Sequence, residues 1–250
     1  LDSDKASYER LAWTEKGDAF AVIKGTEDKR YKDKVYAAIG YTDFAAAGGP
    51  KKTFYDPAAD KTFPEGMSIS PNRGATWTES LTALTFGIRT LAKSDAPAGA
   101  KPGEAGADAP APPTPPVPET PEEEKVDLIL WHAKDPRLQS QQQVQESADK
   151  NYSYLSIFRV KDQKFLRLAD DTLRTVNIAP KELFAIGTDM REYELMSNLD
   201  GRRFQDVYVI NLETGERKLA LKKARYMGQP STDGTKFFYY EDGHYFVYDM

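Results

Sequence analysis

The sequence of 250 residues contains no cysteine and only two histidines, His132 and His244. The missing cysteines exclude disulfides, thiolate zinc sites and cysteine nucleophiles, and so few histidines leave little scope for histidine-based catalysis. No apolar run approaches the ~20 residues of a membrane span, and no apolar signal region opens the chain. An initiator Met is also missing, which indicates a processed chain or a piece of a longer one.

Charge of either sign is not in large excess. Lys and Arg number 34 and Asp and Glu number 39, which gives a formal net charge of −5. A mildly acidic chain without a strongly basic patch is a poor nucleic-acid binder, so we expect no nucleic-acid partner. Hydrophobic residues make up 40% of the chain, and its 14 Tyr, 12 Phe and 3 Trp are sufficient to build a core.

One segment, residues 94–124, differs sharply in composition from the rest. It holds nine of the sixteen prolines, no aromatic residue, and seven acidic residues against one Lys, a net charge of −6. Such a segment buries too little apolar surface to offset its ordering entropy, which predicts a disordered, Pro/Ala/Glu-rich tether. The P-x-x-P spacing from Pro112 to Pro116 is also compatible with a ligand for an SH3-like groove, but composition favours a spacer.

The rest of the chain has the pattern of β-strands and turns. Short runs rich in β-branched and aromatic residues are bounded by turn residues, which predicts strands at 19–23, 34–39, 83–88, 126–131, 154–160, 206–210, 236–240 and 245–248. Gly17, Gly215, Gly234 and Gly243 lie in tight-turn tetrads, where glycine supplies the positive φ of a hairpin. The Gln-rich segment 137–150 fits a short helix or a loop equally well. We therefore predict an all-β protein.

The strand pattern repeats. Residues 154–188 and 206–240 follow the same order of strands and turns, with an offset of 50 when Pro180 is placed on Pro230. We find the second half of this unit again at 67–88 and at 11–23. An internal repeat of this length favours a β-propeller of about four blades of four-stranded antiparallel sheet over a β-sandwich.

We divide the chain into propeller blades at 1–93, the tether at 94–124, and further blades of the same domain at 125–250. The blade pattern is out of phase at both ends: it opens on an inner pair of strands (11–23) and stops one strand short of a finished blade. We therefore expect an incomplete propeller that is part of a larger one.

Three strings carry a resemblance to a known family: LAWTEKGDAFAVIKG, MSISPNRGATWTESLTALTFGIR and YMGQPSTDGTKFFYYEDG. They resemble the repeat of TolB-like β-propellers, in which an aromatic residue, Ser-Pro and Asp-Gly precede a strand. The stretch from Val126 to Tyr248 is similar to the amino-terminal propeller of bacterial prolyl-oligopeptidase-family serine peptidases. That resemblance implies a periplasmic or secreted protein whose propeller screens substrates and precedes an α/β-hydrolase domain.

We identify no catalytic residue. A nucleophile elbow needs Gly-x-Ser-x-Gly, and the nearest string, Gly66 to Ser70, lacks the second glycine and lies in a strand. Neither histidine follows a plausible nucleophile. Asp170-Asp171 fits a turn better than a metal site, so no metal and no cofactor are expected. Glu122 to Glu124 is interpreted as a solvated charge run, although a similar acidic pair binds substrate in dipeptidyl-peptidase propellers.

The densest cluster of mixed chemistry consists of Trp131, His132, Lys134, Asp135 and Arg137. One interpretation makes Trp131 a core aromatic residue at the end of a strand, followed by a polar loop. The other makes the cluster a binding loop at the propeller mouth or against a hydrolase domain.

The sequence leads to three functional hypotheses. The first is a non-catalytic propeller segment of a serine peptidase, which gates substrate access and scaffolds a carboxy-terminal hydrolase domain. The second is a free-standing TolB-like module that binds a protein or peptide partner. The third, less favoured, is a propeller lactonase or glycosidase with inward carboxylates around an ion.

Overall fold

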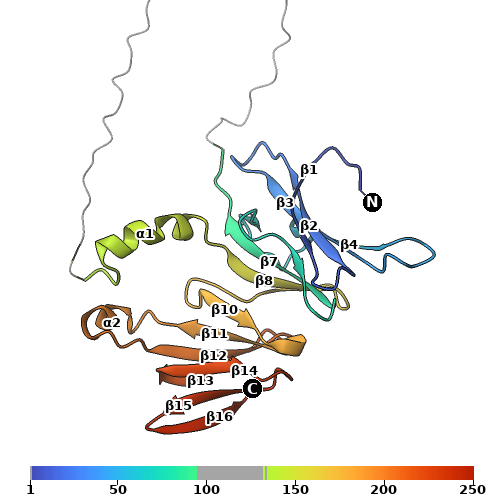
Figure 1. Cartoon of the computed structure of the whole chain (residues 1–250). Coiled ribbons are helices and arrows are strands. Elements are labelled where there is room, and N and C mark those ends of the chain that lie inside the picture. The colour runs from blue at the N-terminus through green and yellow to red at the C-terminus, as the bar shows by residue number, and fades with distance from the viewer. Residues whose placement is uncertain (1, 95–131, 133) are drawn as a thin grey trace, which may run out of the picture.

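The computed structural model describes residues 2–94, 132 and 134–250 (Figure 1). These residues form four antiparallel sheets that follow one another in chain order, and each sheet is a meander of sequential strands. This is the organisation of β-propeller blades, so the predicted all-β propeller architecture is confirmed. The predicted strand at 126–131 and residues 95–124 of the tether lie outside the described residues.

Sheets 1 and 2 form the amino-terminal half. Sheet 1 contains β1 (Ser7–Trp13), β2 (Phe20–Thr26), β3 (Val35–Thr42) and β4 (Lys51–Tyr55), followed by the 3-10 helix η1 (Pro57–Ala59). Sheet 2 contains β5 (Met67–Ile69), β7 (Ala83–Thr90), β8 (Tyr154–Arg159) and β9 (Lys164–Arg167), with the two-residue β6 (Thr76–Trp77) also paired to β7.

Sheets 3 and 4 complete the chain. Sheet 3 contains β10 (Thr175–Ile178), β11 (Phe184–Asp189), β12 (Gln205–Asn211) and β13 (Arg217–Ala224), with the 3-10 helix η2 (Pro180–Glu182) between its first two strands. Sheet 4 contains β14 (Tyr226–Pro230), β15 (Lys236–Glu241) and β16 (His244–Asp249).

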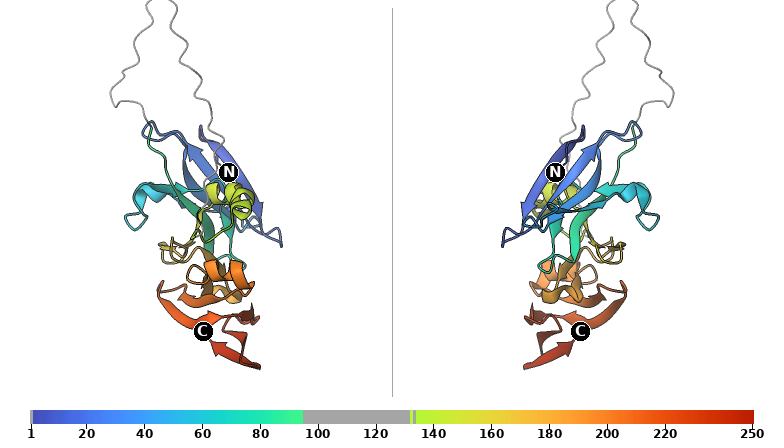
Figure 2. Two further views of the ribbon diagram at one scale, coloured as in Figure 1. Left: turned by 90° about the vertical axis from the view of Figure 1, so that its left-hand side faces the viewer. Right: turned by 90° about the vertical axis from the view of Figure 1, so that its right-hand side faces the viewer.

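Two helices flank the sheets at one end (Figures 1 and 2). The Gln-rich segment is α1 (Gln139–Lys150), which resolves the choice between helix and loop, and α2 (Glu194–Asp200) joins β11 to β12. Arg137 connects the two helices: its Nη1 lies 2.6 Å from Asp149 Oδ2 and its Nε lies 3.1 Å from Glu194 Oε1. None of the described helices is both long and apolar enough to cross a membrane.

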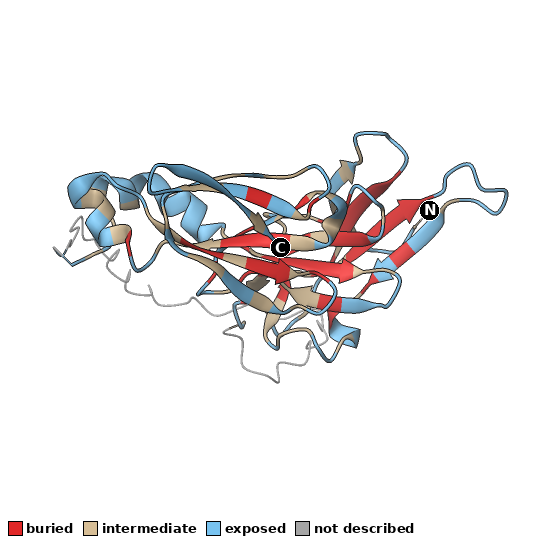
Figure 3. Cartoon of the chain, turned by 90° about the horizontal axis from the view of Figure 1, so that it is seen from below, coloured by how far each residue is buried: buried red, intermediate tan, exposed pale blue. Residues whose placement is uncertain are grey.

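Three apolar layers hold the sheets face to face, because successive side chains of a strand point to opposite faces. On β8, Phe158 packs towards sheet 1 with Tyr55 and Phe86, whereas Leu155 and Ile157 pack towards sheet 3. Phe237 of sheet 4 is 1% exposed and packs against Val207 and Val209 of sheet 3. Figure 3 shows the buried residues along the middle of the strands, with exposed loops and helices at the ends.

The repeat has the predicted period but a different phase. The unit 154–188 begins with β8 and β9 of sheet 2 and ends with β10 and β11 of sheet 3, so it straddles two sheets. Sheet 1 is a complete four-stranded sheet, which corrects the expected phase error at the amino terminus. Sheet 4 has three strands among the described residues, as expected for the carboxy-terminal end.

Candidate functional site

Each sheet contains one hairpin turn of the same geometry, at residues 14–19, 78–83, 179–184 and 231–236, which we call turns 1 to 4. In every case the backbone N–H of the first residue donates to the carbonyl of the sixth, at 2.7–3.0 Å. The fourth residue has a positive φ in all four turns: Gly17 (68°), Leu81 (57°), Glu182 (58°) and Gly234 (70°). The four turns therefore share this hydrogen bond and the positive φ of the fourth residue, although in turn 3 the third residue, Lys181, also has a positive φ (62°).

The turns correct two details of the sequence alignment. Turn 2 begins at Thr78, so the equivalent of Trp13-Thr14-Glu15 is Trp77-Thr78-Glu79 and not the Ser70-Pro71 string. Turn 3 begins at Ala179 and turn 4 at Ser231, so the local offset is 52 and Pro180 does not correspond to Pro230.

Turn 3 contacts both turn 2 and turn 4, and these contacts join sheets 2, 3 and 4. The Glu182 carboxylate of turn 3 accepts hydrogen bonds from the Ser80 backbone N–H (3.1 Å), the Ser80 hydroxyl and the Thr82 hydroxyl (3.1 Å) of turn 2. Gly234 of turn 4 lies directly against the Pro180 carbonyl, since an added Cβ would come within 1.8 Å of that oxygen. This row of turns is a structural joint that fixes the spacing of the sheets.

Sheet 4 exposes several aromatic and aliphatic side chains on one side. Its side away from sheet 3, which we call the tyrosine face, presents Tyr226, Phe238, Tyr240, Tyr245 and Val247. Tyr245 is 75% exposed and Val247 67%, and the rings of Phe238, Tyr240 and Tyr245 meet edge to face at 5.1–6.3 Å. Large exposed apolar patches of this kind mark protein-interaction sites.

A groove of about 500 Å³ opens beside this face, between the ends of β13 and β15. We call it the basic groove, because Lys222, Lys223 and Arg225 line one wall and are exposed. Tyr226 and Tyr240 belong to both the groove and the tyrosine face. The groove also contains two carboxylates, which sit in the turn between β15 and β16: Glu241 and Asp242.

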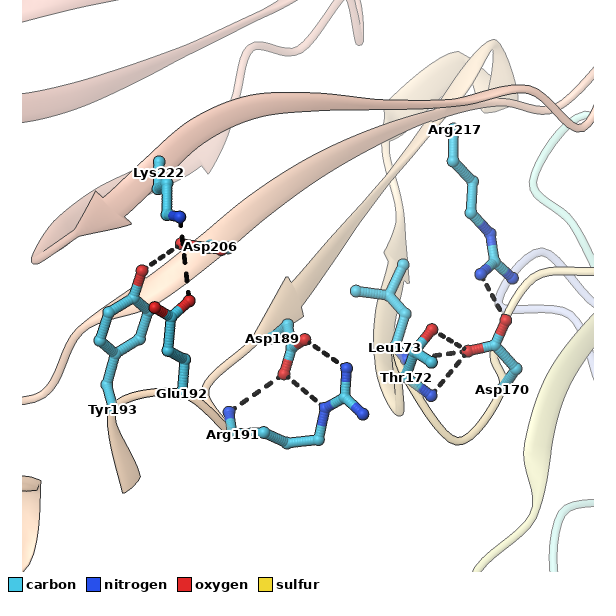
Figure 4. A network of polar contacts seen from close by, with 10 residues as sticks. All are labelled: Asp170, Thr172, Leu173, Asp189, Arg191, Glu192, Tyr193, Asp206, Arg217 and Lys222. Atoms are coloured by element: carbon cyan, nitrogen blue, oxygen red, sulfur yellow. Dashed lines mark hydrogen bonds and ion pairs between the residues drawn. The ribbon is translucent and has the colours of Figure 1, made fainter. Parts of the chain in front are cut away.

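A buried carboxylate, Asp206, forms a hydrogen bond with the backbone of the basic wall (Figure 4). Asp206 is 9% exposed, and its Oδ1 accepts hydrogen bonds from the Tyr193 hydroxyl (2.7 Å) and the Lys223 backbone N–H (2.8 Å). Lys223 has a φ of 56° at an irregularity in the β12–β13 register. The hydrogen bond to Asp206, together with burial, raises the pKa of Tyr193 to about 12. Glu192 lies 3.9 Å from the Lys222 ammonium group.

A second partly buried carboxylate, Asp170, lies in the turn between β9 and β10 (Figure 4). Its Oδ1 accepts hydrogen bonds from the Thr172 hydroxyl and from the backbone N–H groups of Thr172 and Leu173, and its Oδ2 lies 2.5 Å from Arg217 Nη1. Burial by itself would raise the pKa of Asp170, but these bonds outweigh it and hold the pKa well below its usual range. Asp170 is thus part of a structural turn, as the sequence indicated.

The structure separates the five candidate binding residues. Trp131 lies outside the described residues. His132 and Lys134 are exposed and form a local turn, in which Asp135 accepts a hydrogen bond from the His132 backbone N–H at 3.0 Å. Arg137 ties α1 to α2, and this position gives it a structural role. None of these described side chains lines the tyrosine face or the basic groove.

The basic wall was missed by the sequence analysis, although a signal for it exists. Residues 217–225, RKLALKKAR, contain five basic residues and no acidic one. The near-neutral average of the chain outside the tether hides this local excess. Among the described residues no group of three or more His, Asp or Glu side chains is placed to hold a metal ion.

No family model matches the chain, and no curated protein matches it. Similar solved structures include TolB from Acinetobacter baumannii, with 12% identity and a TM-score of 0.34, covering 98% of this chain and 41% of that one. A prolyl endopeptidase structure has 9% identity and a TM-score of 0.38, covering 93% of this chain and 26% of that one.

A third similar structure is the β-propeller domain of the Trilobed protease from Pyrococcus furiosus, with 11% identity and a TM-score of 0.29, covering 98% of this chain and 69% of that one. The chain thus spans less than half the length of the TolB and prolyl endopeptidase chains. These likenesses concern the propeller fold alone.

Proposed function

We propose that the chain is a non-catalytic β-propeller scaffold that binds a protein partner through the tyrosine face of sheet 4. The observation that carries this proposal is the contrast between the two sides of that sheet. Phe237 on the inner side is buried against sheet 3, whereas Phe238 on the outer side is 49% exposed. A partner with an apolar surface would bury the outer side in the way sheet 3 buries the inner one.

The sequence resemblance supplies the class of partner. In the first version of the proposal it is the α/β-hydrolase domain of a prolyl-oligopeptidase-like serine peptidase, and the propeller gates access to that domain in the periplasm or outside the cell. In the second version the chain is a TolB-like interaction module that binds a separate protein. The two versions differ in whether the gene continues past Met250 into a domain with Gly-x-Ser-x-Gly; a stop codon soon after Met250 would overturn the first.

A site-specific cross-linking experiment tests the scaffold itself. A photoreactive phenylalanine analogue at Tyr245 should cross-link to the partner in cells, and mass spectrometry should locate the adduct in one defined protein or domain. The matched control is the same analogue at Val144, which is 84% exposed on α1. Equal adducts at both positions, or none at Tyr245, would overturn the proposal, as would labelling of the purified chain by a serine-reactive fluorophosphonate.

A further inference from the structure

An arginine lies at or just before the first strand of every sheet. Counted back from the first residue of the following turn, it is four residues away in sheet 1, five in sheets 2 and 3, and six in sheet 4. The segments between these arginines and the turns contain no acidic residue. All four side chains are exposed: Arg10, Arg73, Arg174 and Arg225. The four sheets therefore repeat a positive charge as well as a turn.

The arginines of sheets 1 and 2 lie close together. Arg10 Nε donates a hydrogen bond to the Pro71 carbonyl at 2.6 Å. A Cβ added to Gly74, the residue after Arg73, would come within 2.4 Å of the Arg10 Cβ. Because the bond to Pro71 uses Nε, both terminal nitrogens of Arg10 remain available to a ligand. Neither of the two arginines has a carboxylate within 4.0 Å among the residues that the structure describes.

Tyr152 connects the arginines of sheets 2 and 3. The Arg174 guanidinium lies 4.0 Å from the centre of the Tyr152 ring, and the Tyr152 hydroxyl donates to the Arg174 carbonyl at 2.7 Å. Burial raises the pKa of Tyr152, and the positive charges of Arg174 and Arg73 act in the opposite direction, so both charges lie near this phenol. Asp149 Oδ1 lies 3.8 Å from Arg174 Nη2, but its other oxygen pairs with Arg137 at 2.6 Å.

We call Arg10, Arg73 and Arg174 the arginine row, and its positive charge is not cancelled by its neighbours. Glu9, next to Arg10 in the sequence, pairs with Lys34 at 3.5 Å. Asp149 is shared between Arg174 and Arg137, as described above. The arginine of sheet 4 is left out of the row, because it lines a groove that also contains Glu241 and Asp242.

The chemistry of the row favours carboxylates on an extended chain. A guanidinium group held flat against an aromatic ring keeps its edge N–H groups available, and these bind a carboxylate with two parallel hydrogen bonds. Sheets that pack face to face are about 10 Å apart, and three residues of an extended chain also span about 10 Å. A carboxylate at every third residue of an extended segment would therefore reach one arginine in each of three successive sheets.

We propose that the arginine row binds an extended acidic segment of a partner protein, with carboxylates three residues apart on Arg10, Arg73 and Arg174. This binding site lies at the first strands of sheets 1 to 3 and is separate from the tyrosine face on the outer side of sheet 4. It does not rest on the proposed function, and it gives the chain a second surface for a partner.

The test measures fluorescence anisotropy of labelled peptides titrated with the full chain. The probe contains five repeats of Gly-Ser-Glu, so its carboxylates are three residues apart. It should bind saturably, and more weakly as salt is added, because exposed charges are screened. A peptide of the same composition with its five glutamates adjacent at one end should bind at least about threefold more weakly, since it reaches fewer arginines. A peptide with Gln in place of every Glu should not bind.

Variants of the full chain locate the site. R73Q/R174Q should weaken binding of the probe at least about tenfold, and R10Q alone should weaken it about threefold. The matched control is K16Q/K161Q, which removes the same charge from two exposed lysines at the other end of the strands, one in turn 1 and one beside turns 2 and 3. This control should leave the affinity unchanged. Circular dichroism checks the fold of each variant, and R10Q keeps the test decisive if R73Q/R174Q does not fold.

Several results would overturn the proposal. Absence of probe binding, or equal weakening by R73Q/R174Q and K16Q/K161Q, would remove the row as the site. Equal affinity for the spaced and the clustered peptide would show that the spacing of the sheets is not read. An oligothymidylate with the same number of charges that binds more tightly than the probe would assign the row to phosphates instead. Loss of the Tyr245 cross-link in cells with probe binding intact would refute the scaffold and leave the arginine row in place.

Discussion

Replacing Gly234 by Ala tests whether the row of turns holds sheet 4 against sheet 3. Gly234 has a φ of 70°, and an added Cβ would lie 1.8 Å from the Pro180 carbonyl oxygen of turn 3. That oxygen is a backbone atom, so it cannot move aside by a change of rotamer. Gly17 is the matched control, because it occupies the same position of turn 1 with a φ of 68° and an added Cβ there would meet no atom within 4 Å.

The two substitutions share one cost and differ in another. A left-handed backbone conformation costs Ala roughly 1–2 kcal/mol at either position. At Gly234 the close contact with Pro180 adds about 1–3 kcal/mol, the usual cost of overpacking. We therefore expect the free energy of unfolding to fall by about 2–5 kcal/mol in G234A, against about 1–2 kcal/mol in G17A. For a chain of this size the larger loss lowers Tm by about 4–20 °C.

Urea unfolding, followed by tryptophan fluorescence and by circular dichroism, measures both losses. Amide hydrogen exchange should in addition show faster exchange in β14 to β16 of G234A, with β2 and β3 unchanged. If the two variants lose equal stability, within about 0.5 kcal/mol, Pro180 and Gly234 are not in contact and the argument for the joint fails.

Three further predictions concern side chains around sheet 3. D170N should have a lower free energy of unfolding than the wild type, because the folded state lowers the pKa of Asp170. The loss of stability should be greatest above pH ~4 and should shrink as the pH falls towards the folded-state pKa. Urea titrations that show a loss independent of pH would contradict this. Y193F should remove one phenol that ionises at about pH 12, as followed by phenolate absorbance, because the bond to Asp206 raises the pKa of Tyr193. The same bond stabilises the fold below pH ~10, and its contribution is lost as the pH rises through the raised pKa. If the phenol lost in Y193F ionises near pH ~10 instead, the bond to Asp206 is refuted. R137A should speed amide hydrogen exchange in α1, since it removes the ion pair with Glu194 of α2. Exchange in α1 equal to that of the wild type would show that Arg137 does not stabilise the helix.

The strands and the repeat period were predictable because local chemistry encodes them. In the stretch from Asp233 to Tyr240, a turn glycine with positive φ precedes an aromatic strand, and both appear in the structure as expected. The phase was not predictable in the same way. Each of sheets 3 and 4 begins with a short strand, Thr175–Ile178 and Tyr226–Pro230, and strands of four or five residues carry too little pattern to mark a boundary between sheets.

The turns show a second limit of local chemistry. Turns 2 and 3 have no glycine at their fourth position, yet Leu81 and Glu182 have a positive φ as Gly17 and Gly234 do. At Glu182 the carboxylate is held by tertiary hydrogen bonds from Ser80 and Thr82, which lie about 100 positions away in the chain. The intrinsic preference of glutamate for negative φ therefore does not decide the backbone conformation at this position.

The candidate site depends even more on contacts that the sequence does not show. The Asp206 carboxylate accepts a hydrogen bond from the hydroxyl of Tyr193, which lies 13 residues earlier in the connection before β12. Lys223, whose backbone N–H donates to the same carboxylate, has a positive φ that its residue type does not predict. By contrast, the charge of residues 217–225 is visible in the sequence, and counting basic and acidic residues in short windows along the chain is sufficient to find it.

The two equivalent tryptophans show how the same local motif takes on different roles at different places in the stack. Trp77, before turn 2, packs its ring over Gly40 of sheet 1 and donates from Nε1 to the Phe20 carbonyl at 2.9 Å. Trp13 holds the same position before turn 1, but it is 56% exposed and contacts Phe20 and Phe44 on the outer side of sheet 1. Trp77 therefore joins sheet 2 to sheet 1, whereas Trp13 packs only against side chains of its own sheet and of the loop after β3. The same local motif thus gives a buried contact between two sheets at Trp77 and an exposed aromatic cluster at Trp13, because only Trp77 has a neighbouring sheet among the described residues.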